Sequence, residues 1–218
     1  MSQPYQSLGA GDDCPERAFT HPRHSLADLE HLREIAGWLR RYLTQPGRPP
    51  ARVAGNWPEV ARLTDAAGRR LRLVVCDETP LRQAGEVGVV GFFGQRRTDA
   101  PAGLLDRMDE ELLEEFLQHP YILAYCSREL PDGEWGNLVL LGAPEAGQQW
   151  RGSERHRRAA EELAPNYYAS VRIHNAQLSG GLEAGELILL RTKYYDYLGA
   201  GPWRGVREQT PPRRFALA

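Results

Sequence analysis

Hydrophobic residues recur every three or four positions from residue 25 to residue 43, a spacing that predicts an amphipathic helix with one buried face. Ser25 and Asp28 resemble a capping pair at the start of this helix. Pro46 and Gly47 follow its last apolar residue and end it. The helix therefore needs an apolar surface elsewhere in the chain on which to pack.

Beyond this helix, short apolar runs at 60–64 and 71–75 flank a turn-forming stretch, which predicts a β-hairpin. From Gly85 onward the pattern is strand, helix, strand, strand, helix, strand, strand. The predicted strands cover residues 87–95, 121–129, 136–141, 169–177 and 186–195, and the predicted helices cover 101–118 and 152–163. This order predicts an α+β fold with a ferredoxin-like βαββαβ module and an extra C-terminal strand.

The same pattern divides the chain into four regions. Residues 1–24 have few apolar side chains and are expected to form a flexible leader, mobile or draped on the surface. Residues 25–84 would form an extension of one helix and one hairpin, and residues 85–200 the ferredoxin-like module. Residues 201–218 are predicted to be a polar tail.

Charge and composition narrow the class of protein. The 27 basic and 29 acidic residues give a net charge of −2, which argues against a nucleic-acid partner. No apolar run approaches the roughly 20 residues of a membrane-spanning helix, and the first residues lack the pattern of a secretion signal. Three cysteines without paired spacing fit a reducing cytoplasm. We therefore expect a cytoplasmic protein without a membrane or nucleic-acid partner.

Two further features of the composition bear on origin and on metals. A single lysine beside abundant arginine, alanine, glycine and proline is typical of a GC-rich bacterial genome. The histidines show no spacing that is typical of metal ligands, so no metal site is expected.

Alternation within the predicted strand 169–177 indicates a candidate site. Val171 and Ile173 can cover a core, so Arg172 and His174 are expected to project from the opposite, open face of the sheet. An imidazole can exchange protons near neutral pH, which makes His174 a candidate catalytic acid or base. Arg172 beside it would anchor an anionic or carbonyl group.

Tyr121 and Tyr125 are expected on the same open face, because they alternate with Ile122, Ala124 and Cys126 in the preceding strand. Their hydroxyl groups could donate hydrogen bonds to a small organic molecule bound there. Packing at a sheet interface is the other interpretation of these two tyrosines. The four polar side chains together predict a small-molecule site.

Two stretches give the chain a resemblance to a known superfamily: Trp150-Arg151-Gly152-Ser153-Glu154-Arg155-His156 and Ala164-Pro165-Asn166-Tyr167-Tyr168. With the order of strands and helices, over about half of the chain, they resemble the dimeric α+β barrel superfamily, which includes antibiotic-monooxygenase-like, chlorite-dismutase-like and aldoxime-dehydratase-like proteins. The resemblance implies an open sheet face that meets a second copy and encloses a cavity. In the heme-binding branches a helical histidine is the axial iron ligand, which makes His156 the candidate heme ligand.

Three functions follow from these patterns. The first is an enzyme that converts a small organic molecule with His174 and Arg172. The second is a heme protein with His156 as axial ligand. The third is a non-catalytic ligand-binding or dimerisation protein, in which the polar sheet face is an interface. A homodimer formed through the open face is expected unless the N-terminal helix and hairpin cover that face instead.

Overall fold

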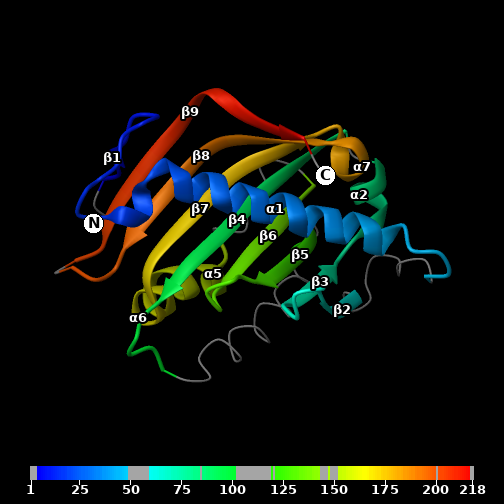
Figure 1. Cartoon of the computed structure of the whole chain (residues 1–218), viewed down its shortest axis with the longest axis horizontal. Helices are drawn as coiled ribbons and strands as arrows, with labels where there is room; N and C mark the ends of the chain where they lie inside the picture. Colours follow the sequence, from blue (N-terminus) through cyan, green and yellow to red (C-terminus); the bar gives the residue numbers. More distant parts are fainter. Residues whose placement is uncertain are drawn as a thin grey trace.

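The computed structural model describes residues 4–48, 59–83, 85–101, 119, 121–142, 147, 152–199 and 201–216. Within these residues the chain has an α+β fold, with one nine-stranded sheet and a long helix lying across one of its faces (Figure 1). The predicted α+β class is confirmed. The first predicted helix of the module falls on residues 102–118, which lie outside the described residues.

The sheet contains all of the predicted strands. Its members are β1 (Gln6–Ser7), β2 (Glu59–Thr64), β3 (Arg70–Val75), β4 (Glu86–Arg96), β5 (Ile122–Glu129), β6 (Trp135–Leu141), β7 (Tyr168–Ser179), β8 (Glu186–Asp196) and β9 (Trp203–Ala216). They lie in the order β1-β9-β8-β7-β4-β6-β5-β3-β2, and every pair except β1–β9 is antiparallel. The predicted hairpin is β2–β3, and it extends the sheet beyond β5. The segment predicted as a polar tail forms β9, which pairs with β8 along most of its length.

The long helix α1 (Pro22–Leu43) begins three residues before the predicted start. Its N-cap is His21, whose Nδ1 accepts a hydrogen bond from the Arg23 amide, and Pro22 occupies the first helical position, where a missing N–H costs nothing. The prediction that Ser25 and Asp28 cap this helix is therefore wrong. Both residues lie within α1 and not at its start, and both side chains are buried.

The apolar side of α1 packs on the sheet and forms the main core. The buried helix residues are Leu29, Leu32, Ile35, Ala36, Leu39 and Leu43, and they join apolar side chains from β3 through β8. We call the sheet face under α1 the inner face, and the opposite one, with Phe92, Ile173 and Lys193, the outer face. α1 thus covers one face of the sheet from within the same chain, which is the arrangement expected from the sequence as the alternative to a dimer.

Gly91 in β4 allows α1 to approach the inner face closely. A Cβ atom at this position would lie 2.6 Å from Cδ1 of Leu32, whose side chain is almost fully buried. We expect Gly91→Ala to lower the free energy of unfolding by about 1–3 kcal/mol, since an overpacked core must shift. Urea denaturation measures this loss. Gly11→Ala, where nothing lies within 4 Å of the added carbon, is the control and should change stability by less than about 0.5 kcal/mol. Equal stabilities for the two variants would mean that the helix can move away without cost.

Shorter helices lie at the ends of the strands. They are η1 (Ala18–Thr20), α2 (Glu78–Gln83), α5 (Glu154–Arg158), the π-helical η2 (Ala159–Leu163), α6 (Ala164–Tyr167) and α7 (Gly181–Ala184). The segments α5, η2 and α6 follow one another without a break, which confirms a helix near the predicted range 152–163. α2 and α7 lie together near the C-terminal end of α1 (Figure 1).

The leader follows the edge of the sheet beside β9 (Figure 1). Gln6 and Ser7 pair in parallel with Gly205 and Val206, and the Leu8 amide donates to the Val206 carbonyl at 2.8 Å. The Leu8 side chain is buried. The described part of the leader, predicted from its composition to be mobile or draped, is thus paired with the sheet and packed against it.

Candidate functional site

His174 and Arg172 lie on the inner face, under α1. His174 in β7 is opposite Gly91 of β4 on one side and Thr192 of β8 on the other, and its side chain is fully buried. Val171 and Ile173 point to the outer face instead. The prediction that Arg172 and His174 project away from the core is wrong, because the core side of the strand also contains a buried acidic partner from α1.

That partner is Asp28. Its Oδ2 atom lies 2.8 Å from Nε2 of His174 and accepts a hydrogen bond from Nε of Arg172 at 2.6 Å. The second carboxylate oxygen accepts from Nη2 of Arg172 at 2.9 Å, so the guanidinium is held by both oxygens. Burial would raise the pKa of Asp28, but the hydrogen bonds from His174 and Arg172 outweigh it and hold this pKa below its ordinary value.

The chain of contacts continues through the other ring nitrogen of His174. Its Nδ1 lies 2.9 Å from Oγ1 of Thr192, whose side chain is also fully buried. Carboxylate, imidazole and hydroxyl are thus linked in a line, an order that can pass a proton. Because neither His174 nor Thr192 is exposed, a substrate cannot reach this line in the present conformation. The catalytic roles of His174 and Arg172 stay predictions.

A second polar cluster lies next to the first on the inner face. The Tyr194 hydroxyl is 3.2 Å from Oγ of Ser25 and also receives a hydrogen bond from Nη1 of Arg207. Arg207 is 1% exposed, and it donates to the carbonyl oxygens of Gly9, Asp12 and Thr20 in the leader. This buried guanidinium therefore connects the sheet to the leader.

Tyr121 and Tyr125 do not join these residues. Tyr125 lies on the outer face, where its hydroxyl donates to Oδ1 of Asn137 at 2.9 Å and the guanidinium of Arg72 lies over its ring. Tyr121 is 45% exposed at the turn before β5. The prediction of one shared face is wrong for these four residues. An irregularity between Ile122 and Ala124 also places Ile122 on the same side as Tyr125.

His156 lies on α5, and the residues around it test the heme interpretation. Arg157 pairs with Glu161 at 3.3 Å and Arg158 with Glu162 at 3.5 Å, and both arginines are more than half exposed. The guanidinium groups that would meet heme propionates therefore already pair with carboxylates of the same solvent-facing turns. These contacts do not fit a heme site. Heme ligation by His156 stays a prediction that no observed contact supports.

Metal ligation finds no support in the described residues, and two of the three thiols are inert. No group of three or more His, Cys, Asp or Glu side chains in this part of the chain is placed to hold a metal ion. Burial raises the pKa of Cys76 and of Cys126 to about 12, so both thiols stay protonated at neutral pH. No helix among the described residues is long and apolar enough to cross a membrane.

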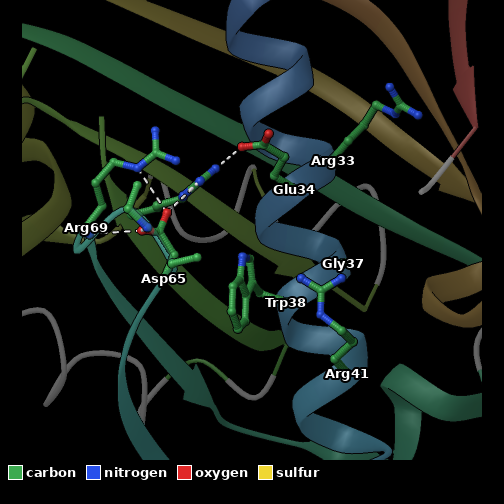
Figure 2. A pocket seen from close by; sticks show the side chains of 10 residues that line it. Arg33, Glu34, Gly37, Trp38, Arg41, Asp65 and Arg69 are labelled. Atoms are coloured by element: carbon green, nitrogen blue, oxygen red, sulfur yellow. Dashed lines mark hydrogen bonds and ion pairs between the residues drawn. The ribbon is translucent and has the colours of Figure 1, made fainter. Parts of the chain in front are cut away.

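A shallow groove of about 350 Å³ lies between α1 and the turn that joins β2 to β3. Figure 2 shows Trp38 projecting from α1 into the space between the helix and this turn, with Asp65 and Arg69 on the far side. The guanidinium carbon of Arg41 lies 4.6 Å from the centre of the Trp38 ring. The described part of the chain offers no carboxylate partner to Arg41, which is exposed beside the groove.

Asp65 and Arg128 form the polar wall of the groove. Asp65 accepts hydrogen bonds from the amides of Arg69 and Ala67 and from the Arg69 side chain, and these bonds hold its pKa below the ordinary value. Nη2 of Arg128 donates to Asp65 at 2.9 Å, and Nη1 donates to Glu34 of α1. Arg128 therefore connects the hairpin turn to the helix.

Neither Asp28 nor the groove is among the functional candidates that the sequence indicates. The spacing of Asp28 from Ser25 resembles a helix cap, whereas its helical spacing from Leu32 and Ile35 places it on the buried side of the helix. The groove joins residues about 30 and 90 positions apart (Trp38, Asp65 and Arg128), and no local pattern relates them. Trp38 beside Arg41 at helical spacing was the available local signal.

Comparison of the chain with known protein families, with curated proteins and with solved structures finds no match in any of the three.

Proposed function

We propose that this chain is a non-catalytic binding protein, and that the groove between α1 and the β2–β3 turn binds an acidic segment of a partner protein. The observation that best supports this function is the Trp38–Arg41 stack at the edge of the groove. The aromatic ring offers apolar contact area, and the guanidinium on it has no carboxylate partner among the described residues. Tryptophan and arginine are the residue types that most often dominate binding energy at protein interfaces.

The charges around the groove favour a carboxylate-bearing ligand. Arg41, Arg69 and Arg128 line it together with two acids, Glu34 and Asp65. A planar guanidinium on an aromatic ring can form two parallel hydrogen bonds with a carboxylate while its apolar face stays covered. An acidic segment with one apolar or aromatic residue would contact both the Arg41 guanidinium and the exposed part of the Trp38 ring.

The same charges favour a protein segment over a nucleic acid. A phosphate backbone is attracted by a continuous basic stripe, and the groove instead contains the carboxylates of Glu34 and Asp65. A short acidic peptide can place a few carboxylates at the arginines, whereas a phosphate backbone would place charges along the whole groove.

The test is a binding titration with a defined peptide. A fluorescein-labelled peptide of sequence Asp-Glu-Phe-Asp-Glu should bind the full chain, as measured by fluorescence anisotropy at low salt. Trp38→Ala and Arg41→Ala should each lower the affinity about ten-fold or more, a loss of about 1.4 kcal/mol in binding free energy. Raising the salt concentration should weaken binding, because the attraction involves exposed charges.

Two controls decide the outcome. Arg62→Ala, which removes an exposed arginine outside the groove, should leave the affinity unchanged. A peptide with Lys in place of the acids should not bind. Tighter binding of a labelled single-stranded oligonucleotide than of the acidic peptide, or equal affinities of the Trp38→Ala and Arg62→Ala variants, would overturn the proposal.

We propose further that residues 85–200 form a ferredoxin-like βαββαβ module. The sheet order supports this: β6 lies between β4 and β5 and is antiparallel to both, and β7 pairs with the other edge of β4. Membership of the dimeric α+β barrel superfamily, a homodimer through the open sheet face and a small-molecule ligand are expectations from the sequence and stay predictions.

A further inference from the structure

The two carboxylates that bind Arg128 differ in how firmly they are held. The Asp65 side chain is 7% exposed and is fixed by amides of its own turn and by Arg69. The Glu34 side chain is 52% exposed on the surface of α1. Arg128 itself is 5% exposed, so its charge depends on these partners. Asp65 is thus fixed by its own turn, whereas Glu34, which also lies 3.6 Å from Nδ1 of His31, can reach solvent by rotation of its side chain.

We propose that Glu34 occupies the place that a carboxylate of the bound partner takes on Arg128, and that Glu34 therefore competes with the partner from within the chain. This inference rests on the binding function proposed for the groove. Glu34, Arg128 and Trp38 all line that groove, so a segment bound on the Trp38 ring shares the groove with the Arg128 guanidinium.

The exchange is favourable in physical terms because the guanidinium is never left unpaired. Breaking a buried ion pair by removing one partner is costly, since an uncompensated charge stays behind. Replacing Glu34 by another carboxylate keeps both ligands on Arg128. The displaced Glu34 gains full hydration on the helix surface. The remaining cost of binding is the competition itself, and it should disappear when Glu34 loses its charge.

The two guanidinium groups also restrict the sequence of the partner segment. One carboxylate must reach Arg128, and a second can meet Arg41, which also lines the groove. A segment with two acids on either side of an apolar residue meets both requirements. A segment with a single acid would bind to only one of the two guanidinium groups. The chemistry of the groove therefore favours acidic residues on both sides of an apolar one.

The decisive variant is Glu34→Gln, which keeps the size of the side chain and removes its charge. We expect it to bind the labelled Asp-Glu-Phe-Asp-Glu peptide about three- to ten-fold more tightly than the wild type, since a neutral amide is the weaker competitor for a guanidinium. Glu208→Gln is the control: it removes an exposed acid on β9 that pairs with Arg191 and lies outside the groove. It should leave the affinity unchanged.

The outcomes separate the two proposals. Unchanged or weaker binding by Glu34→Gln, with the losses for Trp38→Ala and Arg41→Ala intact, overturns the competition and leaves the groove as the binding site. An equal gain in Glu34→Gln and Glu208→Gln also overturns it, because the effect would then be one of general charge. Absence of binding by both the wild type and Glu34→Gln overturns the groove function and this inference with it. Far-ultraviolet circular dichroism of each variant confirms that the fold is intact.

Discussion

Asp28→Asn should be among the most destabilising single substitutions in this chain, with an expected loss of about 3–5 kcal/mol in the free energy of unfolding. The Asp28 side chain is 5% exposed and binds two potential cations, Arg172 and His174. An asparagine of the same shape has no charge to offset the Arg172 guanidinium, which would stay 16% exposed against the helix. For a domain with a typical total stability of about 5–15 kcal/mol, such a loss is a large fraction.

Urea denaturation followed by tryptophan fluorescence measures this effect. Glu30→Gln is the control for stability, because it removes an acid from an ion pair on the exposed side of the same helix, with Glu30 56% exposed. Exposed pairs of this kind contribute at most about 1 kcal/mol. Losses of similar size in the two variants would show that the buried network adds no more than a surface ion pair.

The dependence of stability on pH gives an independent check of the same contact. The pKa of Asp28 is lower in the folded protein than its ordinary value of 3.8, so the unfolded chain binds the proton more readily. The stabilisation is therefore complete at pH values above the ordinary pKa and is lost as the pH falls from about 4 through the folded-state pKa. This part of the acid-induced loss of stability should be missing in Asp28→Asn.

The fold was largely predictable because its periodic patterns are strong. The spacing of Leu29, Leu32, Ile35 and Leu39 indicates one buried helix face whatever that face packs against. The alternation in β7 identifies a strand equally well. Alternation cannot decide which of the two faces of the strand meets the helix. Val171 and Ile173 are apolar enough to cover a core. Arg172 and His174 become compatible with burial only because Asp28 pairs with them.

The site was less predictable because its residues are far apart in the sequence. Asp28 and His174 are 146 positions apart and meet only when α1 crosses the sheet. The leader is a similar case: its composition is that of a flexible segment, yet Arg207, almost 200 positions later, binds its backbone carbonyls. Backbone carbonyls accept hydrogen bonds whatever side chains flank them, so no residue pattern in the leader predicts this contact.

Arg207→Met should release the leader from the sheet. The guanidinium donates to three leader carbonyls and to Tyr194, and its side chain is almost fully buried. Methionine fills much of the same volume but donates no hydrogen bond. Hydrogen bonds to a charged group contribute about 1.5–3 kcal/mol each. Because the freed carbonyls can regain water when the leader opens, we expect a net loss of about 3 kcal/mol in the free energy that holds the leader closed.

Limited proteolysis with trypsin measures this opening directly, since Arg17 lies within the leader. A change of about 3 kcal/mol in the opening equilibrium should raise the rate of cleavage after Arg17 about 100-fold, provided that the leader recloses faster than it is cut. Arg204→Met is the matched control on the same strand: Arg204 faces the outer side, with its guanidinium 5.9 Å from the centre of the Tyr195 ring. Cleavage at the wild-type rate in Arg207→Met would mean that the β1–β9 pairing and the buried Leu8 are sufficient to hold the leader.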